Sequence, residues 1–137
     1  MNDPRQDSLS LLKRYYDAFA AHDHAGMLAC LDEEVEHRIN QGAVERGKQA
    51  FAAFMAAMDR AYEETLTEMV LFASDDGTRA AAEFRVLGRY LETAEGCPEA
   101  RGQRYDLPAG AFFEIRDGRI ARVSVFYNAA DWVAQVS

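Results

Sequence analysis

The chain has 137 residues, of which 49% are hydrophobic and 28% charged, which suits one globular domain with a sizeable core and excludes a disordered chain. Its net charge of −8, from 23 acidic and 15 basic residues, argues against nucleic acid or an anionic membrane as partner, because both bind basic patches. The polar N-terminus and the lack of an apolar run of ~20 residues predict no signal segment or membrane span, so we expect one cytoplasmic domain over residues 1–137.

Cysteine and histidine spacing gives no sign of a metal or a disulfide framework. Cys30 and Cys97 are far apart and lack C-x-x-C spacing, which favours two reduced thiols. His22 and His24 have no third ligand nearby in the sequence. No phosphate-binding glycine motif and no G-x-S-x-G motif occur, so we expect neither a metal nor a cofactor.

The first segment of the chain predicts a helix. Asp3 followed by Pro4 is typical of a helix start, and Asp7 or Ser8 is an alternative cap. The helix should end near His22. Apolar residues at helical spacing, with Tyr15 beside them, predict its buried stripe: Leu9, Leu12, Tyr16 and Phe19.

A second short helix and a strand follow. Asp23 is expected to cap a helix that carries Met27, Leu28 and Leu31. From Glu34 to Ile39 the apolar period changes to two, which is typical of a half-buried strand. This alternation places His37 on the apolar side with Val35. Residues 40–42 are expected to form a turn.

A third helix and two strands are expected in the middle of the chain. The helix begins at Lys48 and presents one apolar stripe, made of Phe51, Phe54, Met55, Met58 and Tyr62. The first strand runs over 66–73. The second runs over 79–91 and has one face lined by Ala80, Ala82, Phe84, Val86, Gly88 and Tyr90.

The strongest local signal is a hairpin between residues 104 and 128. Asp117-Gly118 between two β-rich runs predicts a two-residue turn, with Arg116 opposite Arg119. An unbroken register would give two substantially apolar faces. The first joins Pro108, Gly110, Phe112 and Glu114 with Ala121, Val123, Val125 and Tyr127. One face would cover the core and the other would meet a partner subunit.

Residues 129–136 predict a final turn of helix or a tail, docked by Trp132 and Val133. Three helices followed by a long antiparallel meander indicate an α+β fold.

Three segments resemble the nuclear transport factor 2-like superfamily, and within it the ketosteroid isomerase-related or SnoaL-like polyketide cyclases. They are L-L-K-R-Y-Y-D-A-F-A-A-H-D, D-E-E-V-E-H and F-F-E-I-R-D-G-R-I. The resemblance covers essentially the whole chain. It implies a cone-shaped α+β barrel, in which a strongly curved, mostly antiparallel sheet wraps around three N-terminal helices and an internal apolar pocket. It also implies a homodimer formed through the outer sheet face.

The resemblance to steroid isomerases carries over only in part. It places Tyr15 at the position of their oxyanion donor, and His37 where they have an aspartate base. It places Gly110 where they have a second, protonated aspartic acid. We therefore expect poor activity on steroids, together with a retained cavity and one acid–base group.

Each candidate site residue has a structural interpretation beside the functional one. His37 is either a base or a buried histidine that hydrogen-bonds a neighbour. Either Tyr15 or Tyr16 could present its hydroxyl to the pocket. Asp106 could replace the missing acid or lie in solvent. Gly110 is either floor space for a ligand or a bend in the sheet.

Other residues are expected to line the ligand site. They are Tyr16, Phe54, Met58, Phe84, Gly110, Phe112, Tyr127 and Asn128, and the last could equally cap a loop. The sequence thus supports two hypotheses. One is cofactor-independent proton transfer on a small apolar carbonyl compound by an isomerase, cyclase or dehydratase, with His37 and Tyr15 as catalytic residues. The other is binding of a hydrophobic metabolite without turnover.

Overall fold

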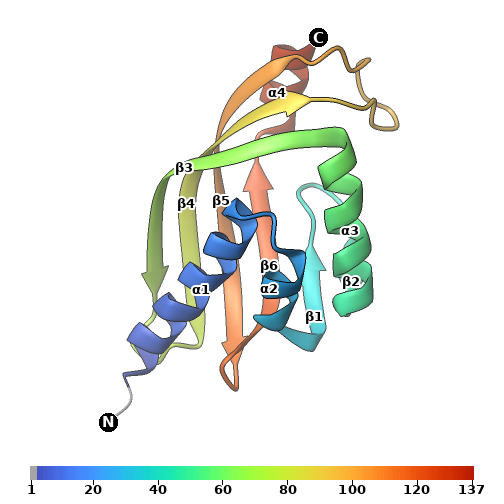
Figure 1. Ribbon diagram of the computed structural model, residues 1–137. Coiled ribbons are helices and arrows are strands. Elements are labelled where there is room, and N and C mark those ends of the chain that lie inside the picture. The colour runs from blue at the N-terminus through green and yellow to red at the C-terminus, as the bar shows by residue number, and fades with distance from the viewer. Residues whose placement is uncertain (1–2) are drawn as a thin grey trace.

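The computed structural model describes residues 3–137 and contains one mixed sheet with helices on its concave side (Figure 1). Its elements are α1 (Pro4–Ala20), α2 (His24–Ala29), β1 (Leu31–Arg38), β2 (Val44–Arg46), α3 (Lys48–Ala61), β3 (Tyr62–Ala73), β4 (Arg79–Tyr90), β5 (Arg104–Arg116), β6 (Arg119–Tyr127) and α4 (Ala129–Val136).

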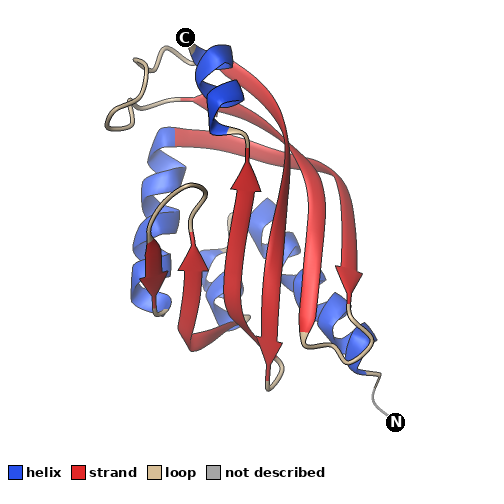
Figure 2. Cartoon of the chain, turned by 180° about the vertical axis from the view of Figure 1, so that it is seen from behind, coloured by secondary structure: helices blue, strands red, loops and turns tan. Residues whose placement is uncertain are grey.

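The strands form a six-stranded sheet in the order β2-β1-β6-β5-β4-β3. Only the β1–β6 pairing is parallel, and the other neighbours are antiparallel. Seen from behind, the curved sheet covers the N-terminal helices (Figure 2). The expected α+β cone with a mostly antiparallel sheet is confirmed.

The helix starts follow the capping residues in the sequence. The Asp3 carboxylate accepts hydrogen bonds from the backbone N–H groups of Arg5 (3.1 Å) and Gln6 (3.4 Å), so the first of the two alternative caps is used. Asp23 caps α2 in the same way. The buried face of α1 is centred on Leu11, Leu12, Tyr15 and Ala18. The centre of the buried face therefore lies beside the predicted stripe, and the residues of that stripe other than Leu12 lie at the edge of the buried face.

Three of the strands differ from the sequence prediction. β1 begins at Leu31, three residues earlier than expected, and the short β2 was not predicted. Strand β3 begins at Tyr62 rather than at Leu66, directly after α3. A register shift between Thr67 and Val70 bends this strand, which pairs with β4 on both sides of the bend (Figure 1).

The hairpin of β5 and β6 has the predicted turn but a different register. Arg116 lies opposite Arg119, as expected, and Ile115 opposite Ile120. Ala121 is then an extra residue, because the next pair joins Glu114 to Arg122. All later pairs are displaced by one position. Each β5 residue beyond this point therefore shares its face with the other set of β6 side chains than the one expected.

The predicted composition of the two hairpin faces was therefore wrong. The concave face joins Ala109, Ala111 and Phe113 with Val123, Val125 and Tyr127, and the outer face joins Gly110 and Phe112 with Ser124 and Phe126. Phe112 is 52% exposed and contacts the ring of Phe126 at 5.6 Å between centroids.

The C-terminal segment is a helix of eight residues. Asn128 caps it by accepting a hydrogen bond from the Asp131 backbone N–H at 3.1 Å. Trp132 is buried against Tyr90, with ring centroids 4.9 Å apart. Val133 is 41% exposed, so the prediction that it docks the helix was wrong. Val136 fills that role, because a helix buries residues three to four positions apart.

Candidate functional site

His37 is the buried ionisable group on the concave face of β1. It is 3% exposed and lies between the α3 rings of Phe51 and Phe54, whose centroids are 4.7 and 4.6 Å from the imidazole. Its Nδ1 is buried and has no hydrogen-bond partner among residues 3–137. Burial lowers the pKa of His37 to about 4, so the imidazole is neutral at physiological pH and Nδ1 can accept a proton.

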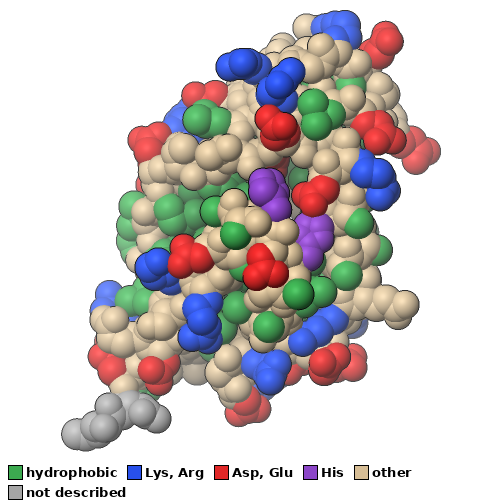
Figure 3. All heavy atoms as spheres, in the orientation of Figure 1, with side chains coloured by type: hydrophobic (Ala, Val, Ile, Leu, Met, Phe, Trp, Pro, Cys, Tyr) green, Lys and Arg blue, Asp and Glu red, His purple; other side chains and the backbone are tan. Residues whose placement is uncertain are grey.

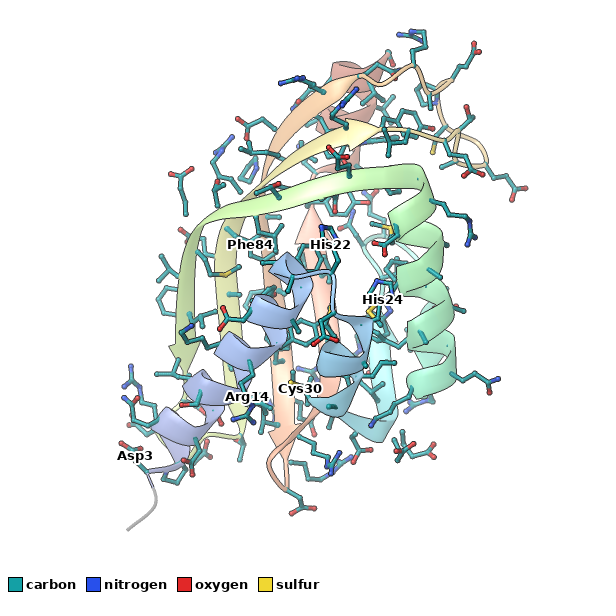
Figure 4. All side chains as sticks on the ribbon, viewed as in Figure 1. Asp3, Arg14, His22, His24, Cys30 and Phe84 are labelled. Carbon is teal, nitrogen blue, oxygen red and sulfur yellow. The ribbon has the colours of Figure 1, made fainter. Side chains whose placement is uncertain are left out.

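Two tyrosines of α1 pack against the same face of the sheet. Tyr15 contacts Tyr16 and Phe113 edge to face, at 5.1 and 6.0 Å between centroids. Tyr16 contacts Phe113 at 6.1 Å and Phe84 at 5.8 Å. Figure 4 shows Phe84 on the sheet beside the C-terminal half of α1, with His22 just beyond the helix end.

Both phenols keep their protons at neutral pH. Burial raises the pKa of Tyr15 and the pKa of Tyr16 well above the ordinary value for tyrosine. A protonated phenol is a hydrogen-bond donor, so either hydroxyl is chemically suited to stabilise a negative oxygen.

A second polar group lies on the concave face of β3. The Tyr105 hydroxyl donates a hydrogen bond of 2.6 Å to Oε2 of Glu64. Between the two residues lies Gly88 of β4, which pairs with both of them. A Cβ atom at Gly88 would overlap the Tyr105 ring and hydroxyl, so this glycine allows the ring to cross β4.

Aromatic residues surround this carboxyl group. The Tyr62 ring lies 6.5 Å from Tyr105 and 6.0 Å from Trp132, measured between centroids. Burial and the neighbouring Glu64 both raise the pKa of Tyr127. The backbone N–H of Tyr127 donates to Oδ1 of Asn40 at 3.1 Å.

Several predicted site residues lie elsewhere. Gly110 and Phe112 are on the outer face, because the extra residue Ala121 changes the register. Asp106 is exposed and forms an ion pair with Arg85 at 2.8 Å, so it does not replace the missing acid. The amide oxygen of Asn128 is used to cap α4.

The sequence analysis missed Glu64 because the strand that contains it was expected to begin at Leu66, two residues after Glu64. The alternation of Tyr62, Glu64 and Leu66 would have placed this carboxyl on the concave face if Tyr62 had been assigned to the strand instead of to the preceding helix. The apolar stripe predicted for α3 is buried only in part: Phe51 and Met55 are buried, whereas Phe54 and Met58 are partly exposed.

One face of the molecule is hollowed. Figure 3 shows His22 and His24 on one face of the molecule, with a recess between His22 and the strand β3. A groove of about 690 Å³ lies elsewhere, between α1, α2 and the β5–β6 turn, and is lined among others by Arg14, Cys30 and Arg119. It contains none of the candidate catalytic residues.

Within the described part of the chain, no three His, Cys, Asp or Glu side chains gather as ligands of a metal ion would. No helix in residues 3–137 combines the length and the apolar character required to cross a membrane.

The chain is similar to proteins of known structure over nearly its whole length. A provisionally assigned polyketide cyclase from a Silicibacter species is 56% identical, with a TM-score of 0.94 and coverage of 97% of this chain and 97% of that chain. Another from Xanthomonas campestris is 49% identical, with a TM-score of 0.94 and coverage of 98% of this chain and 99% of that chain.

An epoxide hydrolase described as LEH-like, from M. tuberculosis, shares the fold. It is 14% identical, with a TM-score of 0.75 and coverage of 99% of this chain and 89% of that chain. No protein of curated function matches the chain. The family model for the SnoaL-like domain matches residues 12–123. This match spans most of the sequence, and with the nearly full-length similarities it shows that the chain belongs to the SnoaL-like domain family, within the nuclear transport factor 2-like fold.

Proposed function

We propose that the protein is a cofactor-independent enzyme that moves a proton next to the carbonyl group of a small, mostly apolar compound. The reaction would be that of an isomerase, a cyclase or a dehydratase. The family and the similar structures named as polyketide cyclases support this class of chemistry. The observation that carries the proposal is the buried, neutral imidazole of His37, whose Nδ1 has no partner in residues 3–137.

His37 is the base in this proposal. Its Nδ1 takes a proton from the carbon next to the substrate carbonyl, which leaves an imidazolium and an enolate. The imidazolium then returns the proton to another atom of the same substrate, so that no other reactant is needed. A pKa of about 4 resembles that of the aspartate base of steroid isomerases, which is only ~4.6.

A tyrosine of α1 stabilises the enolate oxygen. Tyr15 is the candidate at the family position, and Tyr16 lies next to it against Phe84. Preorganised donors of this kind are each worth ~10²–10³ in rate. Phe54, Met58, Phe84 and Tyr127 would form the apolar walls around the substrate.

Exchange of carbon-bound hydrogen tests the proposal without knowledge of the natural substrate. Cyclic and aromatic ketones are incubated with the protein in D₂O, and deuterium uptake next to the carbonyl is followed by NMR. We expect uptake in at least one ketone, a loss of more than tenfold in His37→Gln, and a smaller loss in Tyr15→Phe or Tyr16→Phe. His22→Gln, which changes an exposed histidine outside the concave face, should behave as wild type.

Steroid isomerisation is expected to be weak. Steroid isomerases have an acid where this chain has Gly110, and the loss of one oxyanion donor costs ~10²–10³ in rate. Turnover of a Δ5-3-ketosteroid at the rate of a dedicated isomerase would contradict this expectation.

Binding without turnover is the second candidate function. The aromatic side chains around Glu64 favour it, because ligand sites are lined mostly by aromatic and apolar side chains with a few polar groups. A co-purified metabolite in native mass spectrometry, combined with no deuterium uptake by any ketone, would support this function and contradict the first.

We also propose that two copies associate through the outer sheet face. Five large apolar side chains on four neighbouring strands are exposed there, and we call them the outer-face patch: Val70, Phe72, Leu87, Phe112 and Phe126. Exposed apolar patches of this kind mark interaction surfaces.

A further inference from the structure

Glu64 and Tyr105 form a hydrogen-bonded pair that the proposed reaction does not use. The pair is built by three neighbouring strands, since Glu64, Gly88 and Tyr105 occupy one row across β3, β4 and β5. The hydrogen bond of 2.6 Å requires the Tyr105 ring to lie over Gly88, where any side chain would displace it. Such an arrangement holds the carboxyl group in one orientation.

The chemical surroundings favour an uncharged carboxyl group. The titratable groups around it are the phenols of Tyr62, Tyr105 and Tyr127. Burial raises the pKa of Glu64, and the hydrogen bond from Tyr105 opposes this shift only in part. In the described residues, that hydrogen bond is the only one to the carboxyl group, so Oε1 is free to carry the proton.

His37 lies beside the first half of α3, and the Glu64–Tyr105 pair lies beyond the other end of this helix. His37 contacts Phe51 and Phe54 in the first half of this helix, whereas Glu64 follows three residues after its last residue, Ala61. Seven helical residues from 54 to 61 rise by roughly 10 Å. A ligand oxygen bound to Glu64 is therefore a different atom from the carbonyl oxygen that reacts beside His37.

We propose that Glu64 acts as a carboxylic acid that donates a hydrogen bond to a second, distal oxygen of the substrate. Tyr105 donates to Oε2, which makes this atom the carbonyl oxygen of the acid and leaves the O–H of Oε1 for the ligand. The inference rests on the proposed function for the reacting end of the substrate. It selects compounds with an oxygen at each end of an apolar body, and it makes Glu64 a specificity-determining residue.

Two probes that differ only at the distal end test this role. Both 2-naphthol and 6-acetyl-2-naphthol can donate to His37, but only the second offers a distal carbonyl oxygen. We expect the wild-type protein to bind the acetyl compound about two- to tenfold more tightly, because it gains one net hydrogen bond. Fluorescence titration of the naphthol measures both affinities.

Three variants separate a proton donor from a carboxylate. Glu64→Gln keeps a neutral donor and an acceptor, so it should retain the preference for the acetyl compound. Glu64→Met keeps the size but has no donor, so the preference should disappear. Glu63→Met is the matched control, because Glu63 points to the exposed side of the same strand and its loss should change nothing.

The protonation state is measured separately by ¹³C NMR of glutamate-labelled protein, with Glu64→Gln used to assign the signal. We expect a protonated carboxyl at pH 7. A carboxylate at pH 7, equal affinity of wild type for the two probes, no binding of either probe, or complete loss of the preference in Glu64→Gln would overturn the proposal. Probe binding as expected without deuterium exchange would instead support Glu64 and contradict the enzymatic function.

Discussion

At the scale of single residues, burial determines the chemistry of the two ionisable groups on the concave face, because it favours the uncharged form of each. The charged form of either group loses hydration inside the protein, so His37 loses its proton more easily and Glu64 holds its proton more tightly. His37 is therefore uncharged at neutral pH, and the proposed role of Glu64 requires the same of its carboxyl group. A neutral base and a neutral acid are together suited to an apolar ligand that carries oxygen atoms.

The lowered pKa of His37 predicts a loss of stability in acid. The imidazole binds a proton at pH 6.5 in the unfolded chain but only near pH 4 in the folded protein. Between these values the unfolded state binds more protons, so the free energy of unfolding falls as the pH drops, by up to ~3 kcal/mol. Urea unfolding of wild type and His37→Gln from pH 7 to pH 4 measures this effect, which should be smaller in the variant.

A His37→Gln curve parallel to that of wild type over the whole range would show that folding does not lower the pKa of His37.

The raised pKa of Glu64 predicts the opposite trend, a loss of stability as the pH rises. The folded state holds the Glu64 proton beyond the ordinary glutamate value of 4.5, so ionisation at higher pH favours unfolding. Glu64→Gln cannot ionise and should gain stability relative to wild type as the pH increases from 5 to 8. Thermal melting at each pH checks this, and an unchanged difference across the range would contradict it.

At the scale of elements, one extra residue determines which side chains face the helices. Ala121 is an insertion in β6, and beyond it the hairpin pairs are displaced by one. The turn at Asp117 and Gly118 was predictable, because both residues have the positive φ that it requires, 53° and 73°. The bulge leaves no comparable signal in the sequence, since alanine is common in every element.

Gly88 is a further element-scale feature, because it allows β3 and β5 to interact across β4. A methyl group in Gly88→Ala would overlap Tyr105, and we expect a loss of ~1–3 kcal/mol in stability through overpacking. The acetyl-naphthol preference should fall as well, because Tyr105 no longer holds Glu64. Chemical denaturation and the probe titration measure the two effects.

The matched control is Gly110→Ala in the neighbouring strand. A Cβ atom there would meet only the carbonyl oxygen of Ala82, at 3.3 Å, on the outer face of the sheet. Stability should fall less than in Gly88→Ala, and probe binding should not change. Equal losses in the two variants would show that Gly88 serves the strand in general and not the Tyr105 ring.

At the scale of the whole molecule, the convex side of the sheet carries the outer-face patch. Phe72 of β3, Phe112 of β5 and Phe126 of β6 are 51%, 52% and 55% exposed, which is unusual for three phenylalanines on one sheet face. The concave side is covered by the chain's own helices (Figure 2), so the patch is the surface on which a second copy would pack.

We therefore expect a homodimer at micromolar concentration. Light scattering after gel filtration should give twice the chain mass of 15.3 kDa. The double variant Phe112→Glu/Phe126→Glu should give the monomer mass, because it places charges in the interface. Val133→Glu changes another exposed apolar residue, on α4, and should leave the dimer intact. A monomer mass for wild type would contradict the proposed association.

The sequence by itself determined the features that depend on neighbouring residues. The caps at Asp3 and Asp23, the turn at Asp117 and Gly118, and the alternation that buries His37 are local, because each follows from residues within a few positions of one another. The resemblance to the SnoaL-like family also came from the sequence, and the family match confirms it.

Only the tertiary structure decided the features that depend on distant strands. The register of β6 beyond Ala121 is set by pairing with β5, and the pairing of Glu64 with Tyr105 joins positions 41 residues apart through Gly88. Such contacts are chosen by the packing of the whole curved sheet, which no window of the sequence contains. For this reason the sequence predicted the base candidate His37, whereas the acid candidate Glu64 could be identified only from the folded structure.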